Sequence, residues 1–428
     1  MSVSDLRPAA DRRADATSPR VAISNGFGRF HLTLAAAEAD ARGALAVLVT
    51  AAYPGQSKGL AAVARRLPAV ARLVDRREPG LDATRIADLW SAELAYLLAR
   101  QVFRSSPRMT EAATLAAVRR YCRQAARIVA EAEAEVFHFR SGFGGAAVET
   151  AARRDMALLC DHSIAHPTVL ERLTAGEPAP AEGELPRSPF WRWVCDDLAR
   201  CEHVLVNSDF VKSTFIQQGW DDSQVHVLYW GIDDRFLRSI PRRIEEVPKG
   251  PLRLTFAGAF GRRKGADVLT RALLALDDVD WELTLVGSIE PDAATRCAAL
   301  LRDERVRVVG VAPRARLAEI LSATEVFVFP SLAEGSARVV FEALAAGCYV
   351  VTTPNSGSIV EDGVHGALTA PGDDRALADA LGCASVDRER IASVGLRNAE
   401  LVRTHYRQAD YGAGLARLYD TLRERETA

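Results

Sequence analysis

The chain has 428 residues, of which 48% are hydrophobic and 26% are charged, and its formal net charge at pH 7 is −2. This length predicts two domains rather than one core, and the composition excludes fibrous and largely disordered classes. The sequence contains no run of about 18 apolar residues, so we expect no membrane-spanning helix.

Residues 1–19 are polar and charged, and we predict a disordered tail there. The segment contains Asp5, Asp11 and Asp15 and no apolar core, so it does not resemble a signal peptide. The seven cysteines form no CxxC pair, which argues against a disulfide framework or a zinc site and fits a reducing compartment. We therefore expect a cytoplasmic protein.

The first third of the chain is basic. Residues 1–140 contain 21 Arg and Lys against 14 Asp and Glu, a net charge of +7. This favours an anionic partner, although the charge is too widely spread to indicate nucleic acid. Residues 58–77 place apolar side chains on one helical face and arginines elsewhere. We interpret them as a helix packed on its sheet; the alternative is a surface for an anionic acceptor or for peripheral contact with anionic lipid.

Short apolar runs of the buried-strand type alternate with helical stretches along the rest of the chain. The first series lies at 21–24, 44–50, 135–139, 156–160, 203–208 and 225–230. After a polar link at 239–250, a second series lies at 252–258, 281–287, 306–310, 325–330 and 348–353. Near-continuous apolar strands that alternate with helices predict parallel sheets covered on both faces. The sequence therefore predicts an α/β protein with two doubly wound domains facing across a cleft.

One predicted helix in the second series carries an unexpected glutamate. Residues 339–346 (VVFEALAA) are apolar on every face except at Glu342, so the helix should be buried all round. A buried carboxylate is rare without a partner, and the neighbouring sequence offers none. Glu334 lies eight residues earlier, just before Gly335 and Ser336. A ligand with hydroxyl groups and negative charge would suit this segment, because helix starts beyond the carboxyl ends of parallel strands bind phosphate.

A basic turn follows the first strand of the second series. Gly258 and Gly261 lie in this turn, and Arg263 and Lys264 follow them. Two cations at the end of a strand suit a diphosphate, although a solvated basic turn is the ordinary alternative. The turn is not a P-loop, because Lys264 is followed by Gly and Ala rather than Ser or Thr.

The first series offers histidines and glycine turns. His162 and His166 are four residues apart, but Pro167 follows at once and the sequence shows no third ligand, so we expect no metal. Gly26 and Gly28 lie in the first strand–helix turn. A dinucleotide site would need a third glycine and an acidic residue after the next strand, so the sequence disfavours hydride transfer with NAD.

These segments resemble the retaining glycosyltransferases of the GT-B fold, family 4, also called glycosyl transferases group 1. The E-x7-E motif of that family falls on Glu334 and Glu342, and its diphosphate-binding turn falls on GAFGRRKG (258–265). Further similar segments lie at 203–219, 227–236, 356–373 and 403–422. The resemblance covers residues 203–422 and is weaker before them.

The resemblance implies a role for each matching residue in the second half. Lys264 would hold the donor diphosphate. Many members of the family have an arginine where this chain has Ala259, and Arg263 would supply that positive charge instead. Glu334 would bind sugar hydroxyls and Glu342 the ribose, so the donor would be the missing partner of the buried carboxylate. Backbone amides would add diphosphate contacts at Gly335, Ser336 and Ala337.

The N-terminal half of the chain would supply the acceptor side of the site. The resemblance implies that His162 lies near the anomeric carbon of the donor sugar, with His166 as the competing assignment. Gly28 would lie near the donor phosphate. After the predicted tail at 1–19, the resemblance implies an acceptor domain at 20–240, a donor domain at 241–402, and a helix at 403–428 that returns to the first domain.

The implied activity is transfer of a sugar from a nucleoside-diphosphate sugar to an acceptor, with retention of anomeric configuration and without metal or cofactor. The acceptor would be a carbohydrate, a lipid-linked sugar or a small molecule, and the enzyme would be hexosyltransferase-like, serving polysaccharide or glycoconjugate biosynthesis. The alternatives are a non-catalytic sugar-nucleotide binding protein and a nucleotide-sugar epimerase of the same fold.

Overall fold

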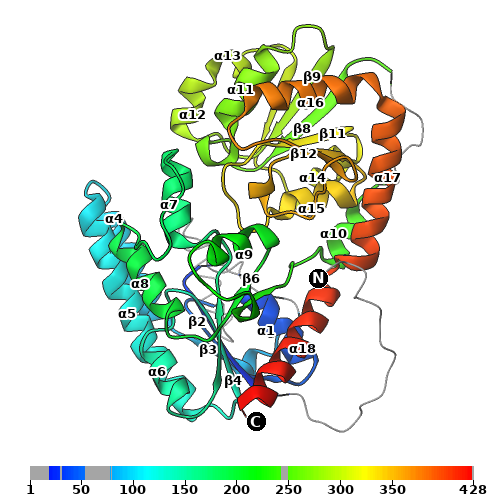
Figure 1. Ribbon diagram of the computed structural model, residues 1–428. Helices are drawn as coiled ribbons and strands as arrows, with labels where there is room; N and C mark the ends of the chain where they lie inside the picture. Colours follow the sequence, from blue (N-terminus) through cyan, green and yellow to red (C-terminus); the bar gives the residue numbers. More distant parts are fainter. Residues whose placement is uncertain (1–18, 29–30, 54–77, 79, 242–248, 427–428) are drawn as a thin grey trace, which may run out of the picture.

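The computed structural model describes residues 19–28, 31–53, 78, 80–241 and 249–426. The predicted tail at 1–19 and the predicted amphipathic helix at 58–77 lie outside the described residues, except for Pro19. The described chain folds into two parallel sheets with helices on both faces (Figure 1). This confirms the predicted α/β architecture.

The N-terminal sheet has the strand order β3-β2-β1-β4-β5-β6-β7. Its strands are β1 (Val21–Gly26), β2 (Leu45–Thr50), β3 (Ile86–Asp88), β4 (Val136–Arg140), β5 (Ala157–Asp161), β6 (His203–Val206) and β7 (Val225–Val227). All neighbouring pairs are parallel. The six apolar runs of the first series are all strands; β3, a three-residue edge strand, was not predicted.

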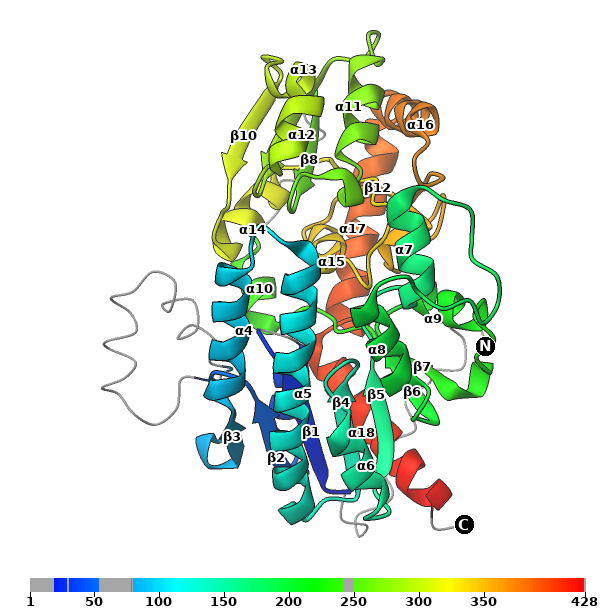
Figure 2. The same ribbon diagram turned by 90° about the vertical axis from the view of Figure 1, so that its left-hand side faces the viewer.

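Helices cover both faces of this sheet. They are α1 (Leu32–Ala41), α4 (Trp90–Val102), α5 (Pro107–Glu131), α6 (Ala146–Ala152), α7 (Pro167–Ala175), α8 (Pro189–Leu198), α9 (Asp209–Ile216) and α18 (Gln408–Glu426). Helices α1 and α18 enclose one apolar core with the strands, and α5, α6, α8 and α9 enclose another. Helices α4 and α5 run side by side, and both contribute residues to the second core (Figure 2).

The C-terminal sheet has the strand order β10-β9-β8-β11-β12-β13. Its strands are β8 (Leu252–Ala257), β9 (Trp281–Val286), β10 (Val306–Gly310), β11 (Val326–Phe329), β12 (Tyr349–Thr352) and β13 (Gly366–Leu368). The helices of this domain are α10 (Asp234–Ser239), α11 (Ala266–Leu274), α12 (Pro291–Arg296), α13 (Ala298–Leu301), α14 (Arg314–Ser322), α15 (Arg338–Ala345), α16 (Asp374–Val386) and α17 (Arg388–His405). One continuous apolar core joins them.

The two chain crossings between the domains pair with each other. The Ile232 amide donates to the Tyr406 carbonyl at 2.8 Å, and the Gln408 amide donates to the Ile232 carbonyl at 3.0 Å. Gly231 has φ +65°, and a Cβ there would lie 2.5 Å from the backbone of Arg407, so only glycine fits this approach. After the second crossing, α18 runs back along the N-terminal domain (Figure 1).

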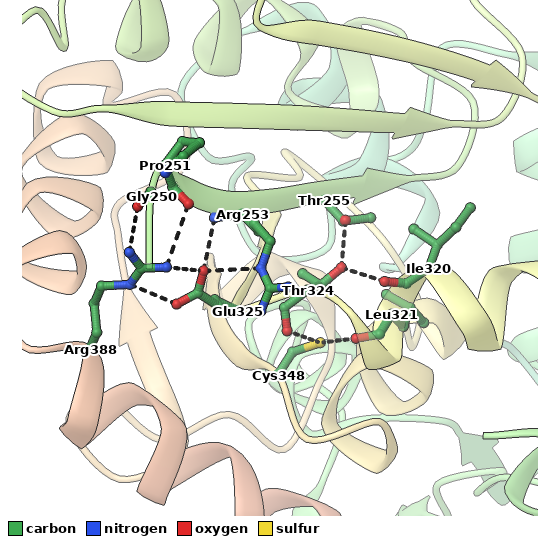
Figure 3. A network of polar contacts seen from close by, with 10 residues as sticks. All are labelled: Gly250, Pro251, Arg253, Thr255, Ile320, Leu321, Thr324, Glu325, Cys348 and Arg388. Atoms are coloured by element: carbon green, nitrogen blue, oxygen red, sulfur yellow. Dashed lines mark hydrogen bonds and ion pairs between the residues drawn. The ribbon is translucent and has the colours of Figure 1, made fainter. Parts of the chain in front are cut away.

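A buried ion network fastens α17 to the C-terminal sheet (Figure 3). Glu325 is only 3% exposed, and its carboxylate pairs with Arg388 of α17 and with Arg253 of β8. Arg388 also donates to the Gly250 carbonyl at 2.6 Å. The network satisfies a carboxylate whose burial would otherwise be costly.

Candidate functional site

The basic turn at 258–265 leaves the carboxyl end of β8, beside the end of β11. Gly265 has φ +78°, and a Cβ there would lie 2.0 Å from the Pro330 carbonyl oxygen. The Leu332 amide donates to the Arg263 carbonyl at 2.8 Å. The basic turn and the loop after β11 are therefore held together by their backbones, so that their side chains converge.

Three predicted site residues meet at one carboxylate oxygen. Arg263 Nη1 lies 2.6 Å and Lys264 Nζ 2.8 Å from Glu334 Oε1. The same Arg263 nitrogen donates to the Ala333 carbonyl at 2.7 Å, and Lys264 Nζ lies 4.9 Å from the centroid of the Phe329 ring. The side chains of Lys264 and Glu334 are 17% and 13% exposed. Because one carboxylate pairs with two cations, the cluster has a net positive charge, which favours binding of an anion.

The segment that leads into α15 passes close to the N-terminal domain. A Cβ at Gly335 would lie 1.8 Å from the Ser163 carbonyl oxygen, and the Ser208 hydroxyl donates to the Gly335 carbonyl at 2.5 Å. Ser336 is half-buried beside it. The Ala337 amide donates to the Ser356 carbonyl at 2.9 Å, so in this conformation it is not available to a diphosphate. The diphosphate contact predicted for the Ala337 amide would therefore require this hydrogen bond to break, and it remains a prediction.

Glu342 is buried as predicted, at 6% exposure, but the statement that the surrounding sequence offers no partner is wrong. Arg314 of α14 donates to Glu342 Oε1 from Nη2 at 2.7 Å and from Nε at 3.1 Å. Arg338, one turn before Glu342 on α15, lies 4.0 Å away. Both arginines also pair with Asp233. Burial raises the pKa of Glu342, and the two arginines act against that rise.

The two candidate histidines lie in the loop after β5, and both are buried. His162 Nδ1 lies 2.8 Å from the Ser141 hydroxyl, and His166 precedes α7. Burial lowers the pKa of His162 to about 4 and that of His166 to about 3. Both rings are therefore neutral at pH 7, and no contact decides which of them faces a donor sugar.

Gly28 lies in the turn after β1 with φ +77°. Its amide donates to Glu93 Oε1 at 3.1 Å, and the Ala52 amide donates to Glu93 Oε2 at 2.8 Å. Glu93 comes from α4 and is 1% exposed. A buried carboxylate thus fixes the turns that follow β1 and β2. The roles predicted for Gly28, His162 and the residues of the C-terminal domain remain predictions.

A second cluster, not predicted from the sequence, is centred on Asp161 at the carboxyl end of β5. His31 Nε2 lies 2.7 Å from Asp161 Oδ2, and the Ser163 hydroxyl donates to Asp161 Oδ1 at 2.6 Å. His138 Nε2 lies 3.5 Å from Asp161 Oδ2. Burial opposes ionisation of Asp161, but the two histidines hold its pKa well below the usual range. A carboxylate directly after a buried apolar strand was the sequence signal that could have identified it.

A cavity of about 650 Å³ lies between the domains. His31 and Trp230 line it from the N-terminal domain, and Asp233, Arg314 and Arg338 line it from the C-terminal domain. Its volume is within the range of about 300–1,000 Å³ that small-molecule sites occupy. The cavity therefore joins the Asp161 cluster to the arginines that hold Glu342.

Part of the chain is similar in sequence to known proteins. Residues 251–385 match the family model described as glycosyl transferases group 1. The chain is 32% identical over 164 residues to a D-inositol 3-phosphate glycosyltransferase of Nocardia farcinica, covering 35% of this chain and 36% of the relative. It is 31% identical over 202 residues to a phosphatidyl-myo-inositol mannosyltransferase of Mycobacterium leprae, covering 45% and 52%. The matches thus span about a third and about half of the length of these two relatives.

Nearly the whole chain is similar in structure to solved proteins. Sucrose-phosphate synthase of Thermosynechococcus elongatus superposes with a TM-score of 0.65 at 18% identity, covering 94% of this chain and 99% of that one. HepE of Anabaena in complex with UDP-glucose superposes with a TM-score of 0.62 at 15% identity, covering 94% and 100%. Identities this low bear on fold alone. Residues 251–385 are therefore similar to the glycosyl transferases group 1, within a chain that has the GT-B fold.

Proposed function

We propose that this protein is a glycosyltransferase that moves a sugar from a nucleoside-diphosphate sugar to a hydroxyl group of an acceptor, with retention of anomeric configuration. The observation that carries the proposal is the convergence of Arg263 and Lys264 on Glu334. These residues lie at the carboxyl ends of β8 and β11, where ligands of open α/β sheets bind.

In the proposed reaction, Lys264 and Arg263 stabilise the charge that develops on the departing diphosphate. Preorganised cations act most strongly where charge appears only in the transition state. The bond between the anomeric carbon and the diphosphate oxygen breaks, and a bond from that carbon to the acceptor oxygen forms on the same face. The acceptor proton passes to the departing diphosphate, so atoms and charge balance without a protein nucleophile.

Glu334 has a double task in this proposal. In the structure it neutralises one of the two cations, and a donor diphosphate would take over that role. The carboxylate could then accept hydrogen bonds from sugar hydroxyls. Glu342 would likewise exchange part of its contact with Arg314 for the ribose of the donor.

We infer a cytoplasmic reaction, because the seven cysteines of the chain are all free thiols.

One observation favours a second candidate, a sugar-nucleotide binding protein without turnover. Glu342 and the Ala337 amide already have partners within the chain. A site whose ligand groups are satisfied internally needs rearrangement before it accepts a donor. Turnover separates the two candidates, because a binder gains stability from a nucleotide but releases no diphosphate from a sugar nucleotide.

The first experiment measures melting temperature with UDP, GDP, ADP and NAD. A ligand at about 100 times its Kd stabilises the folded protein by roughly 2.7 kcal/mol. We expect one nucleoside diphosphate to raise the melting temperature and Lys264→Ala to abolish the rise. Lys212→Ala is the matched control, because Lys212 pairs with Asp222 on the N-terminal domain. A rise with NAD alone would contradict the proposal.

The second experiment measures release of the diphosphate from the corresponding sugar nucleotide, beginning with UDP-glucose. Loss of a group that stabilises transition-state charge lowers kcat by about 10²–10³, and we expect this loss in Lys264→Ala but not in Lys212→Ala. If the wild-type protein binds a nucleoside diphosphate but releases no diphosphate from UDP-, GDP- or ADP-sugars, the non-catalytic sugar-nucleotide binding protein would be the better assignment.

A further inference from the structure

A buried carboxylate holds the segment that follows β5. Asp161 is the last residue of β5 and is 2% exposed. Its Oδ2 accepts a hydrogen bond from His31 Nε2 at 2.7 Å, and its Oδ1 accepts one from the Ser163 hydroxyl at 2.6 Å. His31 directly precedes α1, whereas Ser163 lies two residues beyond the end of β5. One side chain therefore joins the start of α1 to the backbone just after β5.

The carboxylate is charged, which strengthens both of these contacts. Burial opposes ionisation of Asp161, but His31 and His138 outweigh it and hold the pKa of the carboxyl below its usual range. A hydrogen bond to an ionised acceptor is shorter and stronger than one between neutral groups. An asparagine at this position would have only one accepting oxygen, so one of the two hydrogen bonds would have to reverse or break. The charge thus lets residue 161 accept from two parts of the chain at once.

The same carboxylate faces the helix that returns from the C-terminal domain. His138 of β4 is fully buried, and its Nε2 lies 3.5 Å from Asp161 Oδ2. Its Nδ1 lies 2.8 Å from the hydroxyl oxygen of Tyr419 on α18. Helix α18 begins at the second interdomain crossing (Figure 1). The cluster around Asp161 therefore draws on three elements, α1, β4 and α18, that are far apart in the sequence.

The segment 161–163 contacts the loop that carries Glu334. A Cβ at Gly335 would lie 1.8 Å from the Ser163 carbonyl oxygen, so no side chain fits between the two backbones. The Ser208 hydroxyl donates to the Gly335 carbonyl at 2.5 Å, which holds the same loop from a second side. The position of Ser163 therefore sets how closely the N-terminal domain approaches Glu334.

His162 lies in the middle of this segment and moves with it. Its amide donates to the Leu205 carbonyl at 2.9 Å, and its Nδ1 lies 2.8 Å from the Ser141 hydroxyl. A shift of the segment would displace this ring relative to Glu334 on the other domain. Displacement of a site residue by about 1 Å can lower a rate by about 10²-fold. The group that holds the segment is therefore placed to control the rate of transfer.

We propose that Asp161 is a positioning residue for sugar transfer: through Ser163 and His31, its carboxylate holds the 161–163 segment at the distance from Glu334 that transfer requires. The inference rests on the proposed glycosyltransferase function, and it adds a residue that acts through the backbone rather than on the donor. The two cations that would hold the diphosphate lie on the other domain. Loss of the carboxylate should therefore slow transfer without weakening the binding of a nucleoside diphosphate.

The test compares Asp161→Asn with Glu325→Gln. Both variants replace a buried carboxylate by its amide, but Glu325 lies at the start of β11, in the network of Figure 3, and Glu334 lies beyond its other end. The measurements are melting temperature, affinity for UDP, GDP and ADP, and release of each diphosphate from its glucose conjugate, well below both melting temperatures. We expect both variants to melt at a lower temperature. Only Asp161→Asn should lose kcat, at least tenfold, with nucleoside diphosphate affinity within twofold of the wild type.

Two further pairs of variants apply if Asp161→Asn does not fold. Ser163→Ala removes the hydroxyl that the carboxylate holds, and Ser163→Thr keeps it, so the first should lower kcat and the second should restore it to within threefold of the wild type. His31→Gln keeps a donor near the position of Nε2 and should retain more activity than His31→Ala. Equal losses within both pairs would contradict the proposal, because the hydrogen bonds to Asp161 would then not matter.

Hydrogen exchange tests the same contact without turnover. The Glu334 and Ala337 amides each donate to a backbone carbonyl of the loop after β12 at 2.9 Å, so both should exchange slowly while their loop is supported. If Ser163 supports that loop, Asp161→Asn should raise the exchange rates of these two amides at least threefold, although the substitution lies on the other domain. Glu325→Gln should leave both rates unchanged.

Three results would overturn the assignment. One is an unchanged kcat in Asp161→Asn with a lower melting temperature, because the carboxylate would then only stabilise its domain. The second is a tenfold loss of nucleoside diphosphate affinity, which would place the effect at the diphosphate site. The third is unchanged exchange at Glu334 and Ala337. Failure of the proposed function looks different: the wild type releases no diphosphate from any of the three conjugates, and hydrogen exchange still decides whether Asp161 supports the loop of Glu334.

Discussion

Arg314 of α14 and Glu342 of α15 are joined by two hydrogen bonds to one carboxylate oxygen, at 2.7 and 3.1 Å. Asp233, beside the first interdomain crossing, holds the opposite end of the same guanidinium. The second glutamate of the E-x7-E motif is therefore tied to the crossing segment through Arg314, and Arg338 lies between the same two carboxylates. Any ligand that engages Glu342 acts on this connection.

The first prediction concerns Glu342→Gln, which keeps the shape of the side chain and removes its charge. The variant leaves Arg314 and Arg338 close together with only Asp233 between them, so the melting temperature should fall. If Glu342 also binds the ribose, nucleoside diphosphate affinity should fall about tenfold, because a hydrogen bond to a charged group contributes roughly 1.5–3 kcal/mol. Thermal melting and nucleotide titration of one preparation measure both effects. A lower melting temperature with unchanged affinity would make Glu342 a purely structural residue.

The second prediction concerns Gly335→Ala. The added methyl group would lie 1.8 Å from the Ser163 carbonyl oxygen, so it would push the 161–163 segment away from the loop that carries Glu334. We expect kcat to fall more than tenfold while UDP affinity changes only a fewfold, since the cations at 263–264 do not move.

Gly382→Ala is the matched control for this substitution. A Cβ at Gly382 would have its nearest neighbour at 3.9 Å, and the residue lies inside α16, where alanine is favoured over glycine by up to about 1 kcal/mol. The control should melt at a slightly higher temperature with unchanged kinetics. Equal kinetic losses in both variants would show that contact with Ser163 is not the cause.

The third prediction uses the network of Figure 3. Arg388→Met leaves Glu325, which is 3% exposed, without its main partner, and removal of one member of a buried ion pair costs about 3–5 kcal/mol. Arg271→Met is the comparison, because Arg271 and Asp374 are 53% and 38% exposed and an exposed pair contributes about 0–1 kcal/mol. Urea unfolding should show a large loss for the first variant and almost none for the second. Similar losses would contradict the idea that Glu325 depends on Arg388.

The fold was predictable from the sequence because it depends on local pattern. Eleven runs of apolar residues are strands, since both faces of each sheet are covered and nearly every position along a strand is apolar. Strands β3 and β13 were missed because each is a three-residue edge strand outside any longer apolar run. Strand β7 is equally short and also lies at an edge, but it was predicted because it begins the apolar run at 225–230.

The candidate site was predictable only where its residues lie within one motif or match a known pattern. Arg263, Lys264 and Glu334 came from two short motifs, and the sheet brings those motifs together. The partner of Glu342 was not predictable, because Arg314 lies 28 residues earlier on another helix. His31 and Asp161 are 130 residues apart and meet only because β1 and β4 place β5 beside the start of α1. Single-sequence patterns do not encode such long-range pairs.

The last prediction concerns pH and His166. Its side chain is 7% exposed, its Nδ1 has no hydrogen-bond partner in the described structure, and burial lowers its pKa to about 3. In the unfolded chain its pKa is about 6.5. The folded state therefore binds this proton less readily than the unfolded state. Stability from the neutral ring is fully present above pH 6.5 and is lost as the pH falls from there toward 3.

His166→Leu removes this titration and fills the same apolar surroundings, beside Phe215. Linkage predicts that the wild type loses about 2 kcal/mol of unfolding free energy between pH 7 and pH 5 through His166 alone. The variant should avoid that loss and should keep the contributions of the other histidines with a lowered pKa, among them His162, whose pKa is lowered to about 4. Urea unfolding at the two pH values measures the difference. The unfolding is monitored by a signal from the N-terminal domain, such as Trp220 fluorescence. An equal loss in both proteins would mean that His166 becomes protonated within the folded state, and that its burial does not hold the ring neutral.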